Sequence, residues 1–236
     1  MTHNNFIDLI RELATYSMLI IHVILWLSGN YLIPIIIGKF AIPLFLFASG
    51  MASYYSKSKI KGVLVESSVL FLMGCILNLT TLGLIIDRVR IFFYYGILQI
   101  IAINKILCYY LKKLKIKYLL ILIPIFILIG IFLIGDFISF TYAIIGLIII
   151  KYKEFNIRGT YYLGKLSLTI FISHHYIFFN LSLILNIFQS INVFVAIIIL
   201  GITIDLYYLL SIFWSRINYK YTLNYLIKST RRFVLK

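Results

Sequence analysis

Residues 7–29 read IDLIRELATYSMLIIHVILWLSG, a run that is long and apolar enough to cross a membrane as a helix. A stripe of five side chains, polar except for Met18, recurs in it at steps of three, four, three and four: Asp8, Arg11, Thr15, Met18 and His22. Because a helix turns once in about 3.6 residues, the stripe falls on one narrow face. Ionisable side chains within a span are costly and usually functional. The alternative is a stripe that only packs against neighbouring helices.

The composition of the whole chain agrees with a membrane protein. It has 236 residues, of which 63% are hydrophobic, and its mean hydropathy of +1.05 is far above that of a soluble domain. We predict an all-α, polytopic transmembrane bundle, one domain over residues 1–236, with about eight spans. The predicted spans are 7–29, 32–55, 62–82, 90–111, 118–135, 137–150, 160–185 and 193–215.

The basic residues predict how the chain is oriented. Most of the 22 Lys and Arg residues follow the second, fourth, sixth and eighth spans, in segments 57–61, 112–117, 151–165 and 216–236. The opposite side holds only Lys39, Arg88 and Arg90. The positive-inside rule therefore predicts an integral protein of the cell membrane with both termini in the cytoplasm. Its excess charge would face anionic lipids, and no basic groove remains for a nucleic acid.

This orientation places Asp8 and Arg11 near the cytoplasmic end of the first span. His22 lies 11 residues beyond Arg11, or about 16 Å toward the other side at ~1.5 Å per residue. An imidazole can deprotonate a nucleophile or accept an acyl group itself, and a guanidinium suits phosphate or carboxylate. Asp8 or the adjacent Glu12 would pair with Arg11. The alternative for His22 is a core histidine bonded to a backbone carbonyl.

A second polar site lies in the seventh span, where residues 167–175 read SLTIFISHH. Adjacent side chains on a helix point about 100° apart, so only one of His174 and His175 is expected to face a shared cavity squarely. A metal ion would prefer an i,i+4 pair with further ligands, and we therefore expect no metal. A structural role for one of the two histidines is the alternative.

Three further polar positions each allow two interpretations. Ser49 and Gly50 in the second span suit close helix packing or close approach to a ligand. Gln99 in the fourth span could orient a substrate or bond a neighbouring helix. Asp205 in the eighth span could pair structurally or take part in catalysis.

Four segments together resemble a known group of membrane enzymes. Asp8-Leu-Ile-Arg11 followed by His22 resembles the opening "DLLRG…H" helix of the acyltransferase-3 proteins and the heparan-α-glucosaminide N-acetyltransferase group. FLFASG at 45–50 is similar to that group's "FLFLSG", and GILQ at 96–99 to its "GVLQR". LGKLSLTIFISH at 163–174 resembles the late "LGxxSLxxYLxH" helix. The segments occur in the group's order and span most of the chain.

The resemblance implies an integral-membrane acyltransferase. It would move an acyl group, acetyl in the first instance, from cytoplasmic acyl-CoA to a sugar or glycoconjugate acceptor such as a glycolipid. The site residues implied are catalytic His22, Arg11 and Asp8, and donor-binding Arg11, Ser49, Gln99 and His174. A homodimer is left open.

The chain also departs from the pattern at two positions. Glu12 replaces the usual Gly after the arginine, and Ile100 replaces the Arg after Gln99. Two other interpretations therefore stay open. One is a small proton- or ion-coupled transporter or flippase that uses Asp8, Arg11 and Asp205 as intramembrane charges. The other is a member of the group without catalytic activity.

Overall fold

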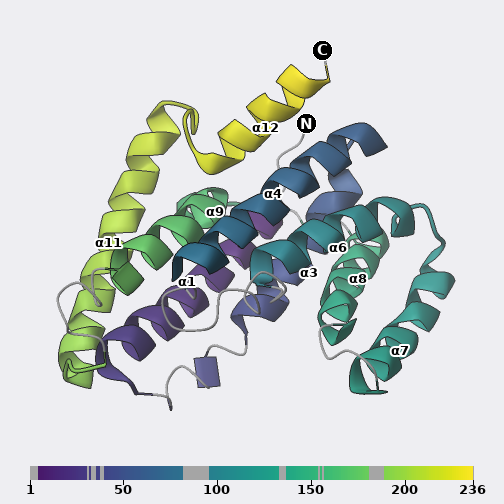
Figure 1. Cartoon of the computed structure of the whole chain (residues 1–236). Helices are drawn as coiled ribbons and strands as arrows, with labels where there is room; N and C mark the ends of the chain where they lie inside the picture. The colour runs from purple at the N-terminus through teal and green to yellow at the C-terminus, as the bar shows by residue number, and fades with distance from the viewer. Residues whose placement is uncertain are drawn as a thin grey trace.

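The computed structural model describes residues 5–30, 32, 36–37, 40–81, 96–132, 137–153, 155, 157–180 and 189–235 (Figure 1). Over these ranges the chain forms helices and turns with no strand, which confirms the all-α prediction. The helices are α1 (Asn5–Ser28), α3 (Ala41–Tyr55), α4 (Ile60–Thr81), α6 (Ile97–Leu111), α7 (Ile116–Phe132), α8 (Phe137–Tyr152), α9 (Tyr162–His174), α11 (Val193–Arg216) and α12 (Leu223–Val234), with a π-helical turn η1 at His175–Phe179.

Several of these helices have the length and composition of membrane spans. Asn5–Ser28, Ile60–Leu79 and Val193–Arg216 are long and apolar enough to cross a bilayer, and four shorter apolar helices accompany them. Each of the eight predicted spans contains a helix. The protein is a membrane protein, while the count of eight stays a prediction. Lys39, Arg88 and Arg90, which bear on the orientation, lie outside the described residues.

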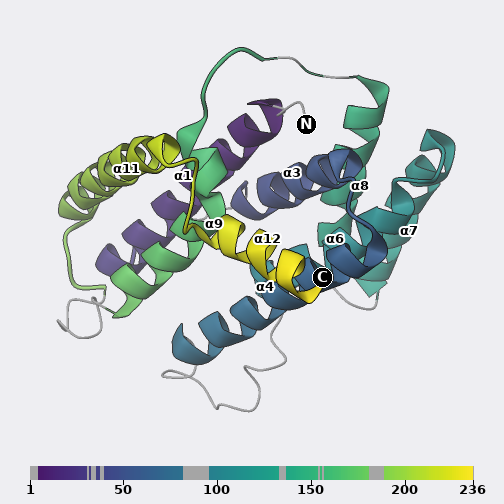
Figure 2. The same ribbon diagram turned by 90° about the horizontal axis from the view of Figure 1, so that it is seen from above.

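Helix α1 lies at the centre of one half of the bundle. It packs against α3, α9 and α11. Seen from above, α11, α1, α3 and α8 follow one another, with α7 at the far edge, and α4 pairs with α6 in front of them (Figure 2). The C-terminal helix α12 contacts both α4 and α9, so it bridges two helices that belong to different parts of the bundle.

Two close crossings fix this arrangement. A Cβ on Gly164 of α9 would lie 2.0 Å from the carbonyl oxygen of Asp8 on α1. Between α3 and α8, a Cβ on Gly50 would lie 2.0 Å from the Ala143 carbonyl oxygen, and one on Gly146 2.2 Å from that of Phe47. The backbones touch where glycine leaves room for them, so Gly50 serves helix packing.

Replacing Gly164 by alanine is expected to destabilise the bundle, because backbone atoms of α1 cannot rotate aside as a side chain would. Overpacking of this kind costs about 1–3 kcal/mol, and we expect a clear fall in the melting temperature of the detergent-solubilised protein. Gly201→Ala on α11 is the matched control, since nothing lies within 4 Å of its added Cβ. Equal melting temperatures for the two variants would contradict the close crossing.

The basic segments meet at one end of the bundle. Lys112 Nζ, after α6, donates to the Ser56 carbonyl oxygen after α3 at 2.6 Å. Lys151 Nζ at the end of α8 donates to the Leu114 carbonyl oxygen. Asn5, where α1 begins, donates to the Ile157 carbonyl oxygen at 3.2 Å. This common end is what the positive-inside assignment requires, and its cytoplasmic location stays a prediction.

Candidate active site

A cavity of about 790 Å³ opens among α1, α3, α4, α6, α9 and α12. Three of the predicted site residues line it: Asp8, Arg11 and Ser49. Among the described residues that line it, the acidic ones are Asp8 and Glu66, and the basic ones are more numerous: Arg11, Lys57, Lys105, Lys112, Lys228, Arg231 and Arg232. The cavity is therefore suited to an anionic ligand.

Asp8 and Arg11 lie one helical turn apart at the wall of this cavity. Arg11 Nη1 is 3.6 Å from Asp8 Oδ1. The Asp8 side chain is 2% exposed, whereas that of Arg11 is 32% exposed. Asp8 therefore acts as a buried counter-charge, and the guanidinium remains accessible from the cavity.

Glu12, next to Arg11, binds the start of α9. Its Oε2 accepts the backbone N–H of Leu163 at 3.2 Å and that of Gly164 at 3.4 Å. Amides in the first turn of a helix have no partner within the helix, and a carboxylate there also matches the helix dipole. The departure from Gly at position 12 thus gives α9 a cap supplied by α1.

Lys112 borders the same cavity from the turn after α6. Its ammonium donates to the carbonyl oxygens of Ser56 and, at 3.4 Å, Ser53. Desolvation, and then the neighbouring Lys113, lower the pKa of Lys112. An anion bound nearby would favour the charged ammonium and oppose that shift.

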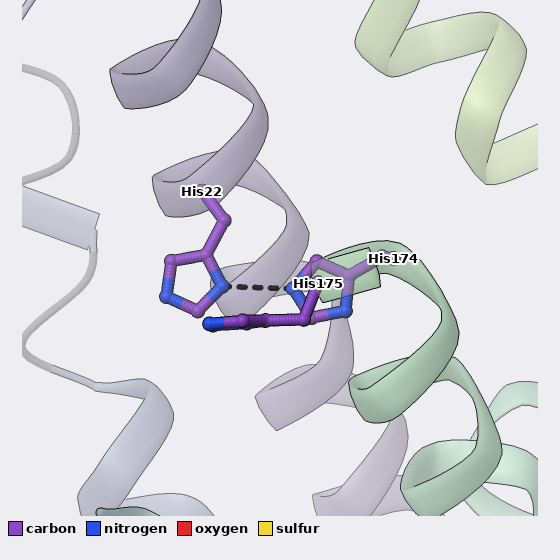
Figure 3. Close-up of side chains that lie close together, drawn as sticks. All are labelled: His22, His174 and His175. Atoms are coloured by element: carbon purple, nitrogen blue, oxygen red, sulfur yellow. Dashed lines mark hydrogen bonds between the residues drawn. The ribbon is translucent and has the colours of Figure 1, made fainter. Parts of the chain in front are cut away.

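His22 belongs to a compact cluster of rings formed by α1 and the end of α9 (Figure 3). Its Nδ1 lies 2.8 Å from Nε2 of His174. His174 is fully buried, and its Nδ1 lies 2.7 Å from the Ile170 carbonyl oxygen. The His22 ring also stacks on Trp26, with centroids 4.6 Å apart. The structure thus brings together two predicted site residues that are 152 positions apart in the chain.

These two hydrogen bonds determine the tautomers of the neutral rings. A ring nitrogen 2.7 Å from a carbonyl oxygen must carry the hydrogen, so His174 donates through Nδ1 and has its lone pair on Nε2. Nδ1 of His22 must then donate to His174. The lone pair of His22 is left on Nε2, which points away from His174 in Figure 3. This is the state that a general base or nucleophile requires.

His175 also contacts His22, although its ring is turned 85° from that of His174, and neither histidine is among the described residues that line the cavity. The His22 ring is nearly parallel to His174 (8°) and nearly perpendicular to His175 (88°), with centroids 5.1 Å away in both cases. His22 and Trp26 fit between the two divergent rings, because Trp26 meets His175 edge-on at 4.7 Å. The π-helical turn begins at His175, and such turns occur often at functional sites.

The three histidines also offer a set of nitrogen ligands. One ring nitrogen from each lies within 4.8 Å of the others, a spacing that could hold a metal ion. The group contains no carboxylate or thiolate to offset a metal charge, and two of its nitrogens already share a hydrogen bond. The expectation of no metal stays a prediction.

The cavity and the histidine cluster meet at Phe171. This side chain lines the cavity, and its ring lies 5.9 Å from the rings of both His174 and His175. His22 and His174 themselves are not among the described residues that line the cavity. Phe171 therefore joins the cavity wall to the rings of His174 and His175.

Gln99 lies apart from both features, between α4 and α6. A Cβ on Gly74 would be 2.5 Å from its Oε1, and its Nε2 lies 3.9 Å from Cys75 Sγ. It is 1% exposed and is not among the described residues that line the cavity. The structure therefore places it where the helix-bonding interpretation expects it.

Sequence reasoning missed an ion cluster on the cavity wall, in which Glu66 pairs with Lys105 and with Arg231. Glu66 is 7% exposed. One signal was available, because Glu66 is an acidic residue within an apolar predicted span. It also missed α12, whose start is marked by the N-cap Thr222 accepting the backbone N–H of Tyr225.

Comparison with known families places the chain. Residues 4–157, well over half of its length, match the model of the family described as heparan-alpha-glucosaminide N-acetyltransferase, catalytic. The chain belongs to this family. The match runs from α1 to the end of α8, so it contains Asp8, Arg11 and His22, whereas His174 and α12 lie beyond it. No curated protein and no solved structure matches the chain. The protein is a membrane enzyme of the acetyltransferase type.

Proposed function

We propose that the protein transfers an acetyl group from acetyl-CoA, bound from the cytoplasmic side, to an amine or hydroxyl of a sugar or glycoconjugate. Both termini would be cytoplasmic. The observation that carries this proposal is the chain of hydrogen bonds from the Ile170 carbonyl through His174 to His22. It leaves a lone pair on His22 Nε2, in the same helix whose Asp8 and Arg11 line a cationic cavity.

In the proposed reaction, His22 Nε2 removes the proton from the acceptor as its nitrogen or oxygen attacks the thioester carbonyl. The carbon–sulfur bond then breaks, and the proton passes from His22 to the CoA thiolate. The imidazolium formed in between donates through Nδ1 to His174, which stabilises the positive charge. Each proton lost by the acceptor thus ends on the thiol of CoA.

The cavity supports the binding of the donor. Its cations suit the phosphates of CoA, and Arg11 lies about 16 Å before His22 on the same helix at ~1.5 Å per residue. An extended pantetheine arm would run inward along α1 and reach the histidines past Phe171. Ser49, also on the cavity wall, leaves room for the arm through its small side chain.

The direct test is acetyl transfer by the purified full-length chain in detergent or liposomes. Radiolabelled acetyl-CoA is offered with amino sugars and glycolipids, and labelled product is measured together with release of the CoA thiol. We expect both to appear in equal amounts with at least one acceptor. Absence of binding to acetyl-CoA together with proton-coupled uptake of a solute would favour a transporter instead. Of the three charges that this alternative would use, Asp8 and Arg11 line the cavity, whereas Asp205 is exposed on α11 and does not line it.

Arg11→Gln is expected to raise the KM for acetyl-CoA about tenfold or more, since a charge-assisted hydrogen bond contributes about 1.5–3 kcal/mol. The single variant also leaves Asp8 buried without this counter-charge, which lowers stability. The double variant Asp8→Asn with Arg11→Gln removes both charges and separates the two effects. If the double variant is stable and keeps the wild-type KM, Arg11 does not hold the donor.

A further inference from the structure

Helix α12 is built into the wall of the cavity by specific contacts. Thr222 caps its first turn, and Ile227 packs against Leu70 of α4 and Ala102 of α6. On the side of α9, Asn224 Nδ2 donates to the Lys165 carbonyl oxygen at 3.0 Å. The helix therefore has a fixed position between α4 and α9.

Arg231 ties α12 to one face of α4. Its guanidinium donates to Ser58 Oγ at 2.7 Å and to Glu66 Oε1. Ser58 lies just before α4 and Glu66 within it, and a Cβ on Gly62 of α4 would lie 3.1 Å from Arg231 Cδ, so glycine makes room for the arginine. The second oxygen of Glu66 pairs with Lys105 of α6. One buried carboxylate thus fixes cations from two other helices.

The two faces of α12 differ sharply in character. The inner face presents Asn224, Lys228, Arg231 and Arg232 to the cavity. The opposite face exposes large apolar side chains, with Leu226 at 47% and Phe233 at 83% exposure. A helix with this distribution lies at a membrane interface with its apolar side in lipid. Its cationic side then covers the cavity.

Two cations of α12, Lys228 and Arg232, do not pair with Glu66 and can bind a ligand. Within the described part of the chain, no carboxylate pairs with Lys228 or Arg232. They lie one helical turn apart, and Lys57 and Lys112 border the same cavity from the segments after α3 and α6. Cations gathered around one cavity repel one another unless an anion binds between them.

We propose that this inner face of α12, through Lys228 and Arg232, binds the phosphate groups of the 3′-phospho-ADP portion of the acyl-CoA donor. The inference rests on the proposed function and assigns part of the donor site to a helix outside the matched family region. A phosphomonoester carries about −1.5 to −2 charges at pH 7 and accepts several charge-assisted hydrogen bonds. The pantetheine arm would then extend from α12 toward Arg11 and Phe171.

The test measures binding directly, so that it does not depend on turnover. Isothermal titration of the solubilised full-length chain is performed with CoA, with CoA lacking the 3′-phosphate, and with pantetheine. Wild type is expected to bind CoA more tightly than the dephosphorylated form. The variant Lys228→Gln with Arg232→Gln is expected to lose about 10–100-fold in affinity for CoA. Its affinity for pantetheine stays that of wild type.

The matched control is Arg216→Gln with Lys220→Gln, which removes two cations at the same spacing. Both residues are exposed, and neither lines the cavity. This control is expected to bind CoA like wild type. It also corrects for a general loss of positive charge at this end of the protein.

Three outcomes would overturn the inference. The first is wild-type affinity for CoA in the Lys228/Arg232 variant, which would leave the proposed acetyl transfer intact. The second is equal wild-type affinity for CoA and its dephosphorylated form, with CoA displaced by phosphatidylglycerol, which would assign these cations to lipid headgroups. The third is that the wild-type protein binds neither CoA nor CoA lacking the 3′-phosphate. Conversely, phosphate-dependent CoA binding without acetyl transfer would support the inference and remove the proposed function.

Discussion

His22→Ala is expected to lower kcat for acetyl transfer by about 10²–10⁴-fold, because a positioned general base contributes that much to the rate. The KM for acetyl-CoA is expected to change little, since the cationic cavity that would hold the donor does not include His22. Initial rates of CoA release, measured at saturating acceptor, give both constants. Full activity in a folded His22→Ala protein would remove the proposed chemistry.

His175→Phe is the matched control for this variant. It replaces another imidazole of the same cluster and keeps a ring against Trp26, which meets His175 edge-on. His175 has no hydrogen bond to His22 among the described residues, so its loss leaves the tautomer of His22 unchanged. We expect kcat to fall far less than in His22→Ala. Equal losses would point to packing of the cluster, rather than to proton transfer, as the cause.

Wild type and His22→Ala can also distinguish general-base catalysis from nucleophilic catalysis by His22. If His22 accepts the acetyl group itself, wild type mixed with radiolabelled acetyl-CoA without acceptor retains label after rapid acid-free denaturation. His22→Ala retains none. Direct transfer predicts no label in either protein. The tautomer places the lone pair on Nε2 in both cases, so the hydrogen bonds alone are compatible with either chemistry.

The sequence was sufficient to predict most of the helices and one contact within the candidate site. Long apolar runs locate helices reliably, and the polar stripe on the first span has a clear period of 3.6 residues. Asp8 and Arg11 are one turn apart on one helix, so local spacing alone predicts their contact. The pairing of Glu12 with the start of α9 has no such local signal, because it joins residues about 150 positions apart.

Helix α12 was not predicted from the sequence, for a different reason. The positive-inside rule explains the cations of this segment by their number alone, without regard to their spacing. Asn224, Lys228, Arg231 and Arg232 nevertheless recur at helical spacing, with Leu226 and Phe233 on the other side. This separation of basic and apolar residues at helical spacing is typical of an amphipathic helix. Its contact with Glu66 depends on the tertiary fold and could not be predicted.

Gln99 is a polar residue whose role the sequence leaves open between ligand binding and helix packing. From the sequence, an amide in an apolar helix can face a ligand or a neighbouring helix with equal ease. The Gln99 amide faces a neighbouring helix because Gly74 of α4 has no side chain and the amide lies over it. That gap belongs to another helix, and no local pattern around Gln99 reveals it.

His174→Phe is expected to lower kcat by about 10–100-fold, the size of effect seen when the partner that orients a metal-binding histidine is removed. The phenyl ring fills the buried site of the imidazole but cannot accept the hydrogen of His22 Nδ1. His22 is then free to carry its hydrogen on either nitrogen, and only one tautomer has its lone pair on Nε2. The KM for acetyl-CoA stays close to that of wild type, because His174 is not among the described residues of the cavity wall.

His174→Gln distinguishes this positioning role from simple packing. The side-chain oxygen of glutamine can accept from His22 Nδ1, while its NH₂ group can donate toward the Ile170 carbonyl oxygen, so both hydrogen bonds have a substitute. We expect His174→Gln to recover much of the kcat that His174→Phe loses, although glutamine fills the ring's volume less well. A merely structural residue would show the reverse order, since phenylalanine matches the packing of the buried ring more closely. That reverse order in kcat, with both variants folded, would show that His174 does not set the tautomer of His22.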